Sequence, residues 1–342
     1  MSERETIQSE VPAICLIGNL NLDLIIRGVR ELPSWGHEIA GSGHTTVTSG
    51  QGGYVSLALA KIGVPVDVIA NVGDDAEGRG ILADLERAGI GTAGVEVAPG
   101  TVTGITVGIV RPDGERAFVS HFASLADFDA ALVERQWETA RQAPVVCLVG
   151  LFSIPGLDPG AAARIFARAR SEGRRTVLDT GWDPDGFKPQ TVAGVRTALR
   201  HVEIFLPNLD EATALTGETD PLKAARALQS DGPRVVVVKC GADGSVAVDG
   251  EQTASIAATP VEVVDAVGAG DAFDGAFLFA HLSGWELQPA LALSSAAAGI
   301  HVSRAGDRHA SLPEAVAAAA QLGVALPPLP PRPAARGGGP RS

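Results

Sequence analysis

The stretch DAVGAGDAFDG at residues 265–275 has the residue types and spacing of a reactive site. Three small residues, GAG at 268–270, directly precede Asp271, and the apolar run VEVV at 261–264 comes before them. The pattern predicts a strand, a tight glycine turn and the start of a helix. This arrangement directs backbone N–H groups and the positive end of a helix at one point. An anion could bind there, with the Asp271 carboxylate beside it.

Two common phosphate-binding motifs do not fit this stretch. A dinucleotide fingerprint requires Gly or Ala where Phe273 stands, and a Walker A loop requires a Gly-Lys pair, which the sequence lacks. An aspartate at a helix start can also act only as a cap, which stabilises a helix by about 1 kcal/mol. The turn alone therefore leaves both capping and anion binding open.

Composition and charge narrow the classes of function. The chain has 342 residues, 45% of them hydrophobic, and a formal net charge of -13. An acidic chain without clustered Lys and Arg argues against a nucleic-acid or anionic-membrane surface. The N-terminal stretch is polar, and the first apolar run, at 14–18, is too short for a signal core or a membrane span. We therefore expect a cytoplasmic protein.

Short apolar runs alternate with amphipathic segments along most of the chain. Runs such as 14–18, 66–73, 145–150 and 235–239 predict strands, and the segments between them have helical periodicity. Continuous apolar strands separated by helices indicate an α/β fold, with a mainly parallel central sheet and helices on both faces.

Two segments, at about 22–48 and 103–122, break this rhythm with Thr/Val/Ile alternation and Gly or Pro turns. The second is typical of a hairpin about PDGE at 112–115. We expect the two segments to form a small sheet beside the main one. The ends of the chain, 1–10 and the proline-rich 327–342, are expected to be flexible tails.

From about residue 12 to 320, the order and spacing of several motifs resemble the ribokinase-like (PfkB) carbohydrate kinase family. The D-x-x-G-A-G-D turn of that family is matched by Asp265, Gly268, Ala269, Gly270 and Asp271. The resemblance implies a ribokinase-like domain over 12–325 that transfers a phosphoryl group from ATP to a hydroxyl of a small sugar or related polyol. Asp271 would be the base, and the amides of the turn would stabilise the transferring group. The small sheet would be a lid over the acceptor.

Further motifs of the family concern ATP and its cations. N-x-x-E is matched by Asn208 and Glu211, which would orient ATP and hold Mg²⁺ through water. An Asn cap with a Glu capping box uses nearly the same spacing. Asp265 and the carbonyls after it are candidate ligands for the monovalent cation, such as K⁺, that some members bind. The K/T-x-G-x-x-G turn beside the nucleotide, whose alternative is a plain strand-to-strand turn, is matched by Lys239, Gly241 and Gly244.

The acceptor side departs from the family pattern. Asp23 matches an aspartate that accepts hydrogen bonds from substrate hydroxyls. In the loop after it, Ser49 replaces a glycine and Tyr54 replaces the substrate-binding asparagine. Because a tyrosine offers one hydroxyl and a stacking face, the sugar is not identified. The resemblance implies substrate binding by Asp23, Gly50, Gly52, Gly53 and Tyr54.

Three alternatives stay open. A nucleoside kinase would stack a base on Tyr54 or Trp35. A 2-keto-3-deoxy sugar acid kinase would offer Arg27 or Arg116 to a carboxylate. A non-catalytic sugar-binding regulatory protein would not need Asp271. In each case, a lid sheet with exposed edges favours a homodimer that pairs through the lid.

Overall fold

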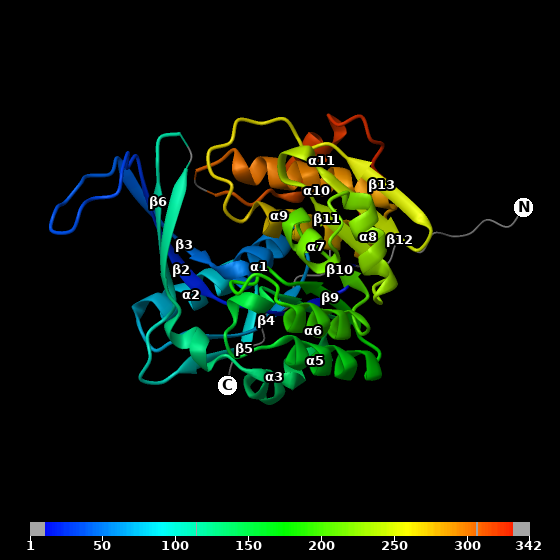
Figure 1. Ribbon diagram of the computed structural model, residues 1–342, viewed down its shortest axis with the longest axis horizontal. Helices are drawn as coiled ribbons and strands as arrows, with labels where there is room; N and C mark the ends of the chain where they lie inside the picture. Colours follow the sequence, from blue (N-terminus) through cyan, green and yellow to red (C-terminus); the bar gives the residue numbers. More distant parts are fainter. Residues whose placement is uncertain (1–10, 114, 306, 331–342) are drawn as a thin grey trace, which may run out of the picture.

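The computed structural model describes residues 11–113, 115–305 and 307–330, which form a large and a small β-sheet (Figure 1). The large sheet has nine strands in the order β13-β12-β11-β10-β9-β8-β1-β4-β5. Neighbours are parallel except for β11-β12-β13, which are antiparallel. The predicted α/β fold with a mainly parallel sheet is confirmed. The strands are β1 (Ile14–Ile17), β4 (Val66–Gly73), β5 (Gly91–Ala98), β8 (Val145–Val149), β9 (Arg175–Asp179), β10 (Ile204–Phe205), β11 (Val235–Lys239), β12 (Ser245–Asp249) and β13 (Gln252–Ile256).

Helices cover both faces of this sheet, which is why its central strands are apolar throughout. On one face α1, α9 and α10 pack against one another, and α5 and α6 pair on the other (Figure 1). The helices are α1 (Gly50–Ile62), α2 (Ala76–Arg87), α3 (Ala130–Arg135), α4 (Trp137–Gln142), α5 (Pro159–Ser171), α6 (Pro189–Leu199), α7 (Leu209–Thr216), α8 (Pro221–Ser230), α9 (Ala269–Leu282), α10 (Leu287–Val302) and α11 (Leu312–Ala320). Three short 3₁₀ turns are η1 (Ala123–Asp127), η2 (Leu151–Ser153) and η3 (Gly241–Asp243).

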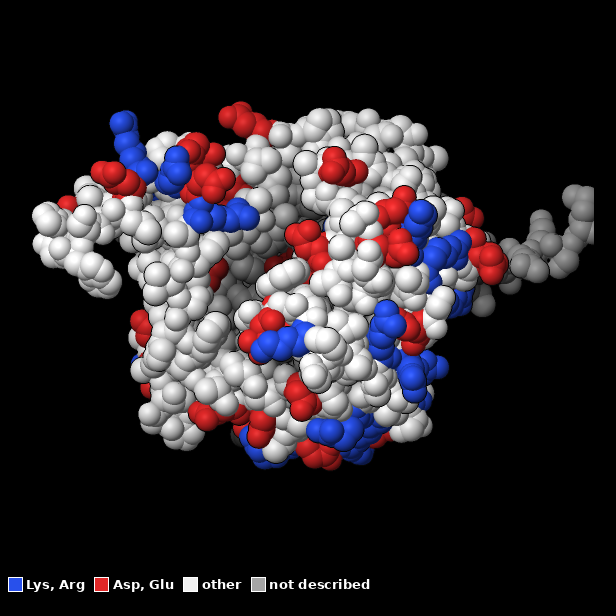
Figure 2. Space-filling model, in the orientation of Figure 1, with Lys and Arg blue, Asp and Glu red and all other residues white. Residues whose placement is uncertain are grey.

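The small sheet contains the two β-rich segments, as predicted. Its strand order is β3-β2-β6-β7, with β2 and β6 parallel and the other pairs antiparallel. The molecular surface is hollowed between this sheet and the large body (Figure 2). The strands are β2 (Asn21–Arg27), β3 (Gly43–Ser49), β6 (Ile105–Val110) and β7 (Arg116–His121).

The strand predicted at 261–264 is wrong. These residues have no regular structure, and Val261, Val263 and Val264 are exposed. The amides of Val264 and Asp265 both donate to the carbonyl of Val302 at the end of α10, at 2.8 and 3.1 Å. A helix end therefore takes the hydrogen bonds that a sheet neighbour would have taken.

The sequence predicted flexible tails at 1–10 and 327–342. Residues 1–10 and 331–342 lie outside the described part of the chain. Within 11–113, 115–305 and 307–330, no helix has the length and apolar character needed to cross a bilayer.

A close backbone contact joins the end of β1 to the start of α1. A Cβ added at Gly52 would lie 2.7 Å from the carbonyl oxygen of Asn19 and 2.7 Å from the carbonyl carbon of Gly18. A Cβ at the next residue, Gly53, would meet its nearest neighbour, Thr48, at 3.5 Å, an ordinary contact. The close backbone contact therefore requires glycine at 52 but leaves room for a Cβ at 53.

We expect Gly52→Ala to lower the free energy of unfolding by about 1–3 kcal/mol, because the backbones must separate. Gly53→Ala, the matched control, should be neutral or stabilise by up to about 1 kcal/mol, since alanine favours the helix. Denaturant unfolding of both variants measures the difference, and equal effects would contradict the contact.

Candidate functional site

A cavity of about 420 Å³ lies at the carboxyl ends of β9, β10 and β11, the edge where parallel sheets bind ligands. We call it the acidic cavity, because three carboxyl side chains line it. Its lining residues are Gln51, Asp179, Gly181, Trp182, Asn208, Glu211, Lys239, Gly241, Gly270 and Asp271.

Asp271 lies in the first turn of α9 and lines this cavity, although it is only 8% exposed. The turn before it depends on Gly268, whose φ is +79°. A Cβ there would be 2.9 Å from Nε2 of His301 and 3.1 Å from the ring of Tyr54. Glycine therefore lets the helix begin close to its neighbours, with the first-turn amides free of intrahelical acceptors.

A buried ammonium group lies beside Asp271. Nζ of Lys239 donates to Oδ2 of Asp179 at 2.8 Å and to both carboxylate oxygens of Asp274 at 3.0 and 2.9 Å. Burial alone would lower the pKa of Lys239, but the two carboxylates raise it. The same ammonium outweighs burial at Asp179 and lowers the pKa of that carboxyl. Lys239 therefore stays charged and joins β9, β11 and α9.

Two further carboxyl groups in the cavity titrate at unusually high pH. Burial, with the negative charge of Asp179, raises the pKa of Asp271 to about 7, although Lys239 and a hydrogen bond from Gln51 oppose the shift. Burial and Asp179 also raise the pKa of Glu211 to about 7. A carboxyl with such a pKa can accept a proton near neutral pH.

Asn208 and Glu211 form the capping box that their spacing allows. Oδ1 of Asn208 accepts from the Glu211 amide at 2.9 Å, and Oε2 of Glu211 accepts from the Asn208 amide at 3.0 Å. Both residues also line the acidic cavity. In the described residues, no three His, Cys, Asp or Glu side chains converge to hold a metal ion by themselves.

A second, apolar cavity of about 540 Å³ adjoins the acidic one. The two share the lining residues Lys239, Gly241 and Gly270, so they lie next to each other at the start of α9. Gly244 also lines the apolar cavity, where a Cβ would lie 1.9 Å from the carbonyl oxygen of Ile256. The K-x-G-x-x-G turn thus borders both cavities.

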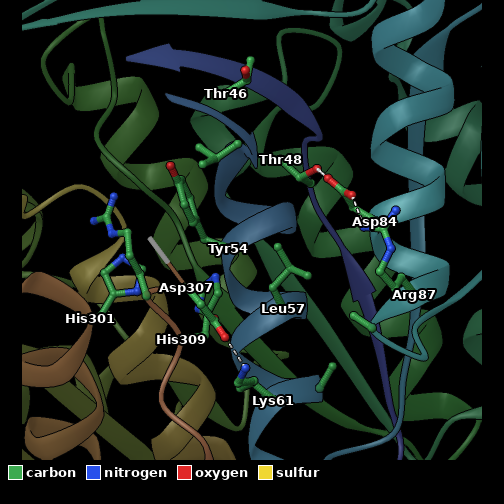
Figure 3. A pocket seen from close by; sticks show the side chains of 14 residues that line it. Thr46, Thr48, Tyr54, Leu57, Lys61, Asp84, Arg87, His301, Asp307 and His309 are labelled. Carbon is green, nitrogen blue, oxygen red and sulfur yellow. Dashed lines mark hydrogen bonds and ion pairs between the residues drawn. The ribbon is translucent and has the colours of Figure 1, made fainter. Parts of the chain in front are cut away.

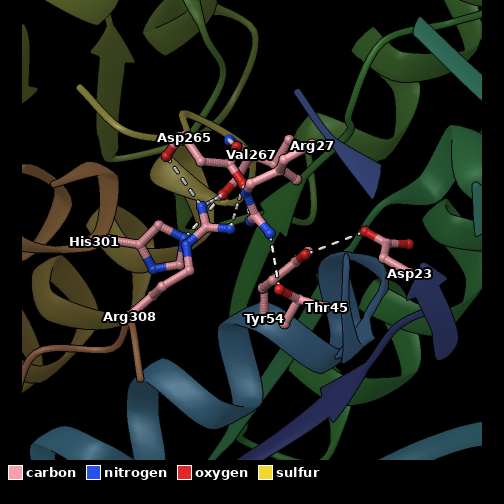
Figure 4. Close-up of polar contacts among 8 residues, drawn as sticks. All are labelled: Asp23, Arg27, Thr45, Tyr54, Asp265, Val267, His301 and Arg308. Carbon is pink, nitrogen blue, oxygen red and sulfur yellow. Dashed lines mark hydrogen bonds and ion pairs between the residues drawn. The ribbon is translucent and has the colours of Figure 1, made fainter. Parts of the chain in front are cut away.

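The buried carboxylate of Asp23, on β2, is held by its neighbours. Oδ1 accepts from the Ser49 hydroxyl at 2.6 Å. Oδ2 accepts from the Tyr54 hydroxyl at 3.1 Å (Figure 4). The two replacements in the acceptor loop therefore both act on Asp23. Gly50, Gly52 and Gly53 begin α1, and Gln51 is the member of that loop that lines the acidic cavity.

Tyr54 is buried, and its ring lines a third cavity of about 730 Å³, the side cavity (Figure 3). Charged groups in this cavity are paired: Lys61 with Asp307 at 2.5 Å, and Arg87 with Asp84 at 2.6 Å. Tyr54 also packs edge-on against His301, with ring centroids 6.1 Å apart. Its side chain is therefore part of the wall between Asp23 and the side cavity.

Asp265, the first aspartate of the turn, is paired with arginines. Its Oδ2 accepts from Arg308 at 2.9 Å and from Arg27, on β2, at 3.5 Å (Figure 4). The guanidinium group of Arg308 thus contacts the carboxylate that the sequence analysis named as a candidate ligand of a monovalent cation.

Sequence reasoning missed five residues of the acidic cavity and its supports: Gln51, Asp179, Gly181, Trp182 and Asp274. One signal was available for Asp274, which stands in the apolar run AFDGAFLFA and needs a cation partner if the run is buried. For Trp182, which is 53% exposed, no local signal distinguishes a cavity residue from a surface one.

Comparison with known proteins identifies the family of the chain. The pfkB family carbohydrate kinase model matches residues 12–315. The ribokinase of Bacillus subtilis is 27% identical over 289 residues, 84% of this chain and 92% of the relative. The 2-dehydro-3-deoxygluconokinase of Thermoproteus tenax is 30% identical over 268 residues, 74% of this chain and 79% of the relative. The structure of Arabidopsis thaliana ribokinase complexed with ribose and ATP aligns with a TM-score of 0.76 at 23% identity, covering 90% of this chain and 99% of the other.

The geometry predicts that the Asp271 carboxyl titrates near pH 7, because it is buried next to Asp179. Carboxyl-labelled aspartate NMR of wild type and Asp271→Asn would identify its resonance and separate it from those of Asp23 and Asp274, whose pKa values burial also raises. A midpoint near the ordinary aspartate value of about 4 would contradict the burial of this group.

Proposed function

Because the chain belongs to the pfkB family of carbohydrate kinases, we propose that it transfers the γ-phosphoryl group of ATP to a hydroxyl of a small sugar, with Asp271 as the base. One observation carries the assignment of roles. Gly270 lines both the apolar and the acidic cavity, and the next residue, Asp271, lines the acidic one, so a nucleotide in the apolar cavity would bring its phosphates to the start of α9.

The apolar cavity suits the base of ATP, with Lys239, Gly241 and Gly244 along the path to the phosphates. The first-turn amides of Gly270 and Asp271 would donate to the transferring group, where the helix dipole also favours negative charge. The amide of Ala269 contributes less, since it already donates to the carbonyl of Ala266 at 3.3 Å.

Asp271 would accept the proton of the acceptor hydroxyl as that oxygen attacks the γ-phosphorus. The new O–P bond forms as the bond to the bridging oxygen breaks, and ADP leaves. Burial, with the negative charge of Asp179, raises the pKa of Asp271 to about 7, high enough for efficient proton transfer at neutral pH.

The residues near the phosphates fit Mg²⁺ held mainly by ATP and water. Asn208 and Glu211 offer oxygen atoms at the cavity wall, and their capping box fixes both side chains. Mg²⁺ keeps several waters and would neutralise phosphate charge when bound. These two side chains would orient the water ligands.

For the acceptor, we propose a monosaccharide bound between Asp23, the 50–53 loop and Trp182. Each oxygen of Asp23 has a second lone pair, so it can accept from a sugar hydroxyl while Ser49 and Tyr54 hold it. Base stacking by a nucleoside finds less support, because Tyr54 is buried and Trp35 is fully exposed.

A keto-deoxy sugar acid is the second candidate acceptor. It is favoured by the 30% identity to a 2-dehydro-3-deoxygluconokinase over 74% of this chain. Arg27, which would bind the carboxylate, already contacts Thr45 at 2.8 Å and Asp265 at 3.5 Å. The monosaccharide is therefore our first choice.

A non-catalytic regulator is disfavoured because Asp271 faces the cavity. We place the reaction in the cytoplasm, where ATP is available.

Turnover with Mg-ATP tests the proposal directly. ADP release should be stimulated by at least one member of a panel of pentoses, hexoses, keto-deoxy sugar acids and nucleosides. Asp271→Asn should lower kcat by about 10²–10⁴-fold with ATP binding nearly unchanged, because it removes a general base. The kcat/KM of the wild type should rise with pH up to about 7 and then level off, because the base must be deprotonated.

The exposed Asp127→Asn is the matched control and should keep wild-type turnover. Equal turnover of Asp271→Asn and wild type would remove Asp271 as the base. If no acceptor stimulates ADP release and one sugar still raises the melting temperature, the regulatory alternative is favoured.

We further propose that the chain forms a homodimer through the small sheet. Edge strands β3 and β7 have unpaired edges among the described strands, and Phe118, Val119 and Phe122 are 45%, 67% and 53% exposed. Exposed apolar groups at a sheet edge favour pairing with a second copy.

Sedimentation equilibrium should give a dimer for wild type and a monomer for Val119→Lys, since a buried lysine would oppose pairing. Leu222→Lys, at an exposed apolar site on α8, is the control and should remain dimeric. A monomeric wild type would refute this interface.

A further inference from the structure

The turn that leads into α9 contacts a buried positive charge. Arg308 follows α10 in the chain and is 6% exposed. Its Nη1 donates to Oδ2 of Asp265 at 2.9 Å, and its Nη2 donates to the carbonyl oxygens of Asp265, at 3.1 Å, and Val267 (Figure 4). One guanidinium group therefore binds a carboxylate and two carbonyls of the same short turn.

The contact with Val267 bears on the anion-binding amides. The carbonyl of Val267 and the amide of Gly268 belong to one planar trans peptide, in which C=O and N–H point in opposite directions. Holding the carbonyl toward Arg308 thus fixes the Gly268 N–H on the opposite edge. His301 contacts the same carbonyl through Nε2 at 2.8 Å, and the Val267 amide donates to Oδ1 of Asp265 at 3.0 Å.

Of the basic side chains near the turn, Arg27, His301 and Arg308, only Arg308 is a cation that binds the backbone carbonyls of Asp265 and Val267. The side chain of Arg27 contacts the Asp265 carboxylate at 3.5 Å and the Thr45 hydroxyl at 2.8 Å, and neither contact is to the backbone of the turn. Burial and the nearby Arg308 lower the pKa of His301 to about 4, so this imidazole is neutral at pH 7. A guanidinium is always charged and presents several donors in a fixed plane, which suits a carboxylate and two carbonyls at once.

We propose that Arg308 is a positioning residue for phosphoryl transfer: its guanidinium fixes the Val267–Gly268 peptide and so orients the anion-binding turn. Arg308 occupies the carboxylate and carbonyl oxygens that a monovalent cation would need, so turnover requires no added K⁺. This inference rests on the proposed kinase function but concerns a residue that touches neither substrate.

The side cavity makes the proposal testable by chemical rescue. Arg308 and His301 both line that cavity, so removal of the guanidinium leaves a space that small cations can enter from solvent. Arg304, four residues earlier, pairs with Glu314 on the surface at 2.8 Å rather than with the turn. Arg304→Met is therefore a matched control for Arg308→Met.

The experiment measures kcat and KM in potassium chloride and in choline chloride at equal ionic strength. Wild type and Arg304→Met should give the same kcat in both salts. In choline, Arg308→Met should lose about 10²-fold in kcat with little change in KM for the acceptor, as expected for misplaced catalytic groups. Potassium or guanidinium ions should restore part of this loss, and Arg308→Lys should retain more activity than Arg308→Met.

Activation of the wild type by potassium, or an unchanged kcat in Arg308→Met, would overturn the proposal. The wild-type salt comparison needs no variant, so a variant that fails to fold does not remove the test. If wild type turns over no acceptor, the proposed function fails, and hydrogen exchange still tests Arg308. Amides of 265–271 should exchange faster in Arg308→Met than in wild type or Arg304→Met, and potassium should slow them in Arg308→Met alone. Equal exchange in all three proteins would refute the positioning role.

Discussion

The site depends on one buried ammonium group surrounded by carboxyl groups. Lys239 contacts Asp179 and Asp274 directly, and Asp271 and Glu211 lie in the same electrostatic field. A buried charge is tolerated only when it is paired and hydrogen-bonded, so this cluster holds β9, β11 and α9 in one arrangement. Burial, with the negative charge of Asp179, raises the pKa of Asp271 to about 7, and Lys239 opposes this shift only in part. The proposed role of Asp271 as a base that accepts a proton near pH 7 rests on this shift.

The small sheet and the large body are joined through polar contacts on both sides of the turn. Asp23 on β2 is held by Tyr54 on α1, and Arg27 at the end of the same strand contacts Asp265. The acceptor side and the anion-binding turn therefore share one strand. Arg308 donates to the same oxygen of Asp265 that Arg27 contacts. This arrangement gives the two replacements in the acceptor loop, Ser49 and Tyr54, a structural role as supports of Asp23.

The fold could be predicted where local pattern decides the structure. The apolar runs form the central strands, which are buried on both faces. The β-rich segments form the small sheet, because their alternation of polar and apolar residues suits a sheet with one exposed face. The run at 261–264 has a similar composition and still forms no strand, because the end of α10 takes its hydrogen bonds. The composition of the run does not reveal that the end of α10 competes for these hydrogen bonds.

The site could be predicted in part for the same reason. Gly268, Gly270 and Asp271 lie within four consecutive residues, so their spacing already predicted a tight turn at a helix start, where either a cap or a bound anion could lie. The partners of Lys239 are 60 and 35 residues away, and those of Asp265 include Arg308, 43 residues away. Such contacts arise only when the sheet and its helices assemble. The family resemblance identified the motifs from their order along the chain. The structure showed which charged side chains contact Lys239 and Asp265.

A crystal structure with a non-hydrolysable ATP analogue and Mg²⁺ would test the central claim most directly. The account predicts the base in the apolar cavity, and the terminal phosphate within hydrogen-bonding distance of the Gly270 and Asp271 amides, with the Asp271 carboxylate facing the open part of the acidic cavity. A nucleotide bound with its phosphates away from the start of α9, or Asp271 turned from the cavity, would contradict it.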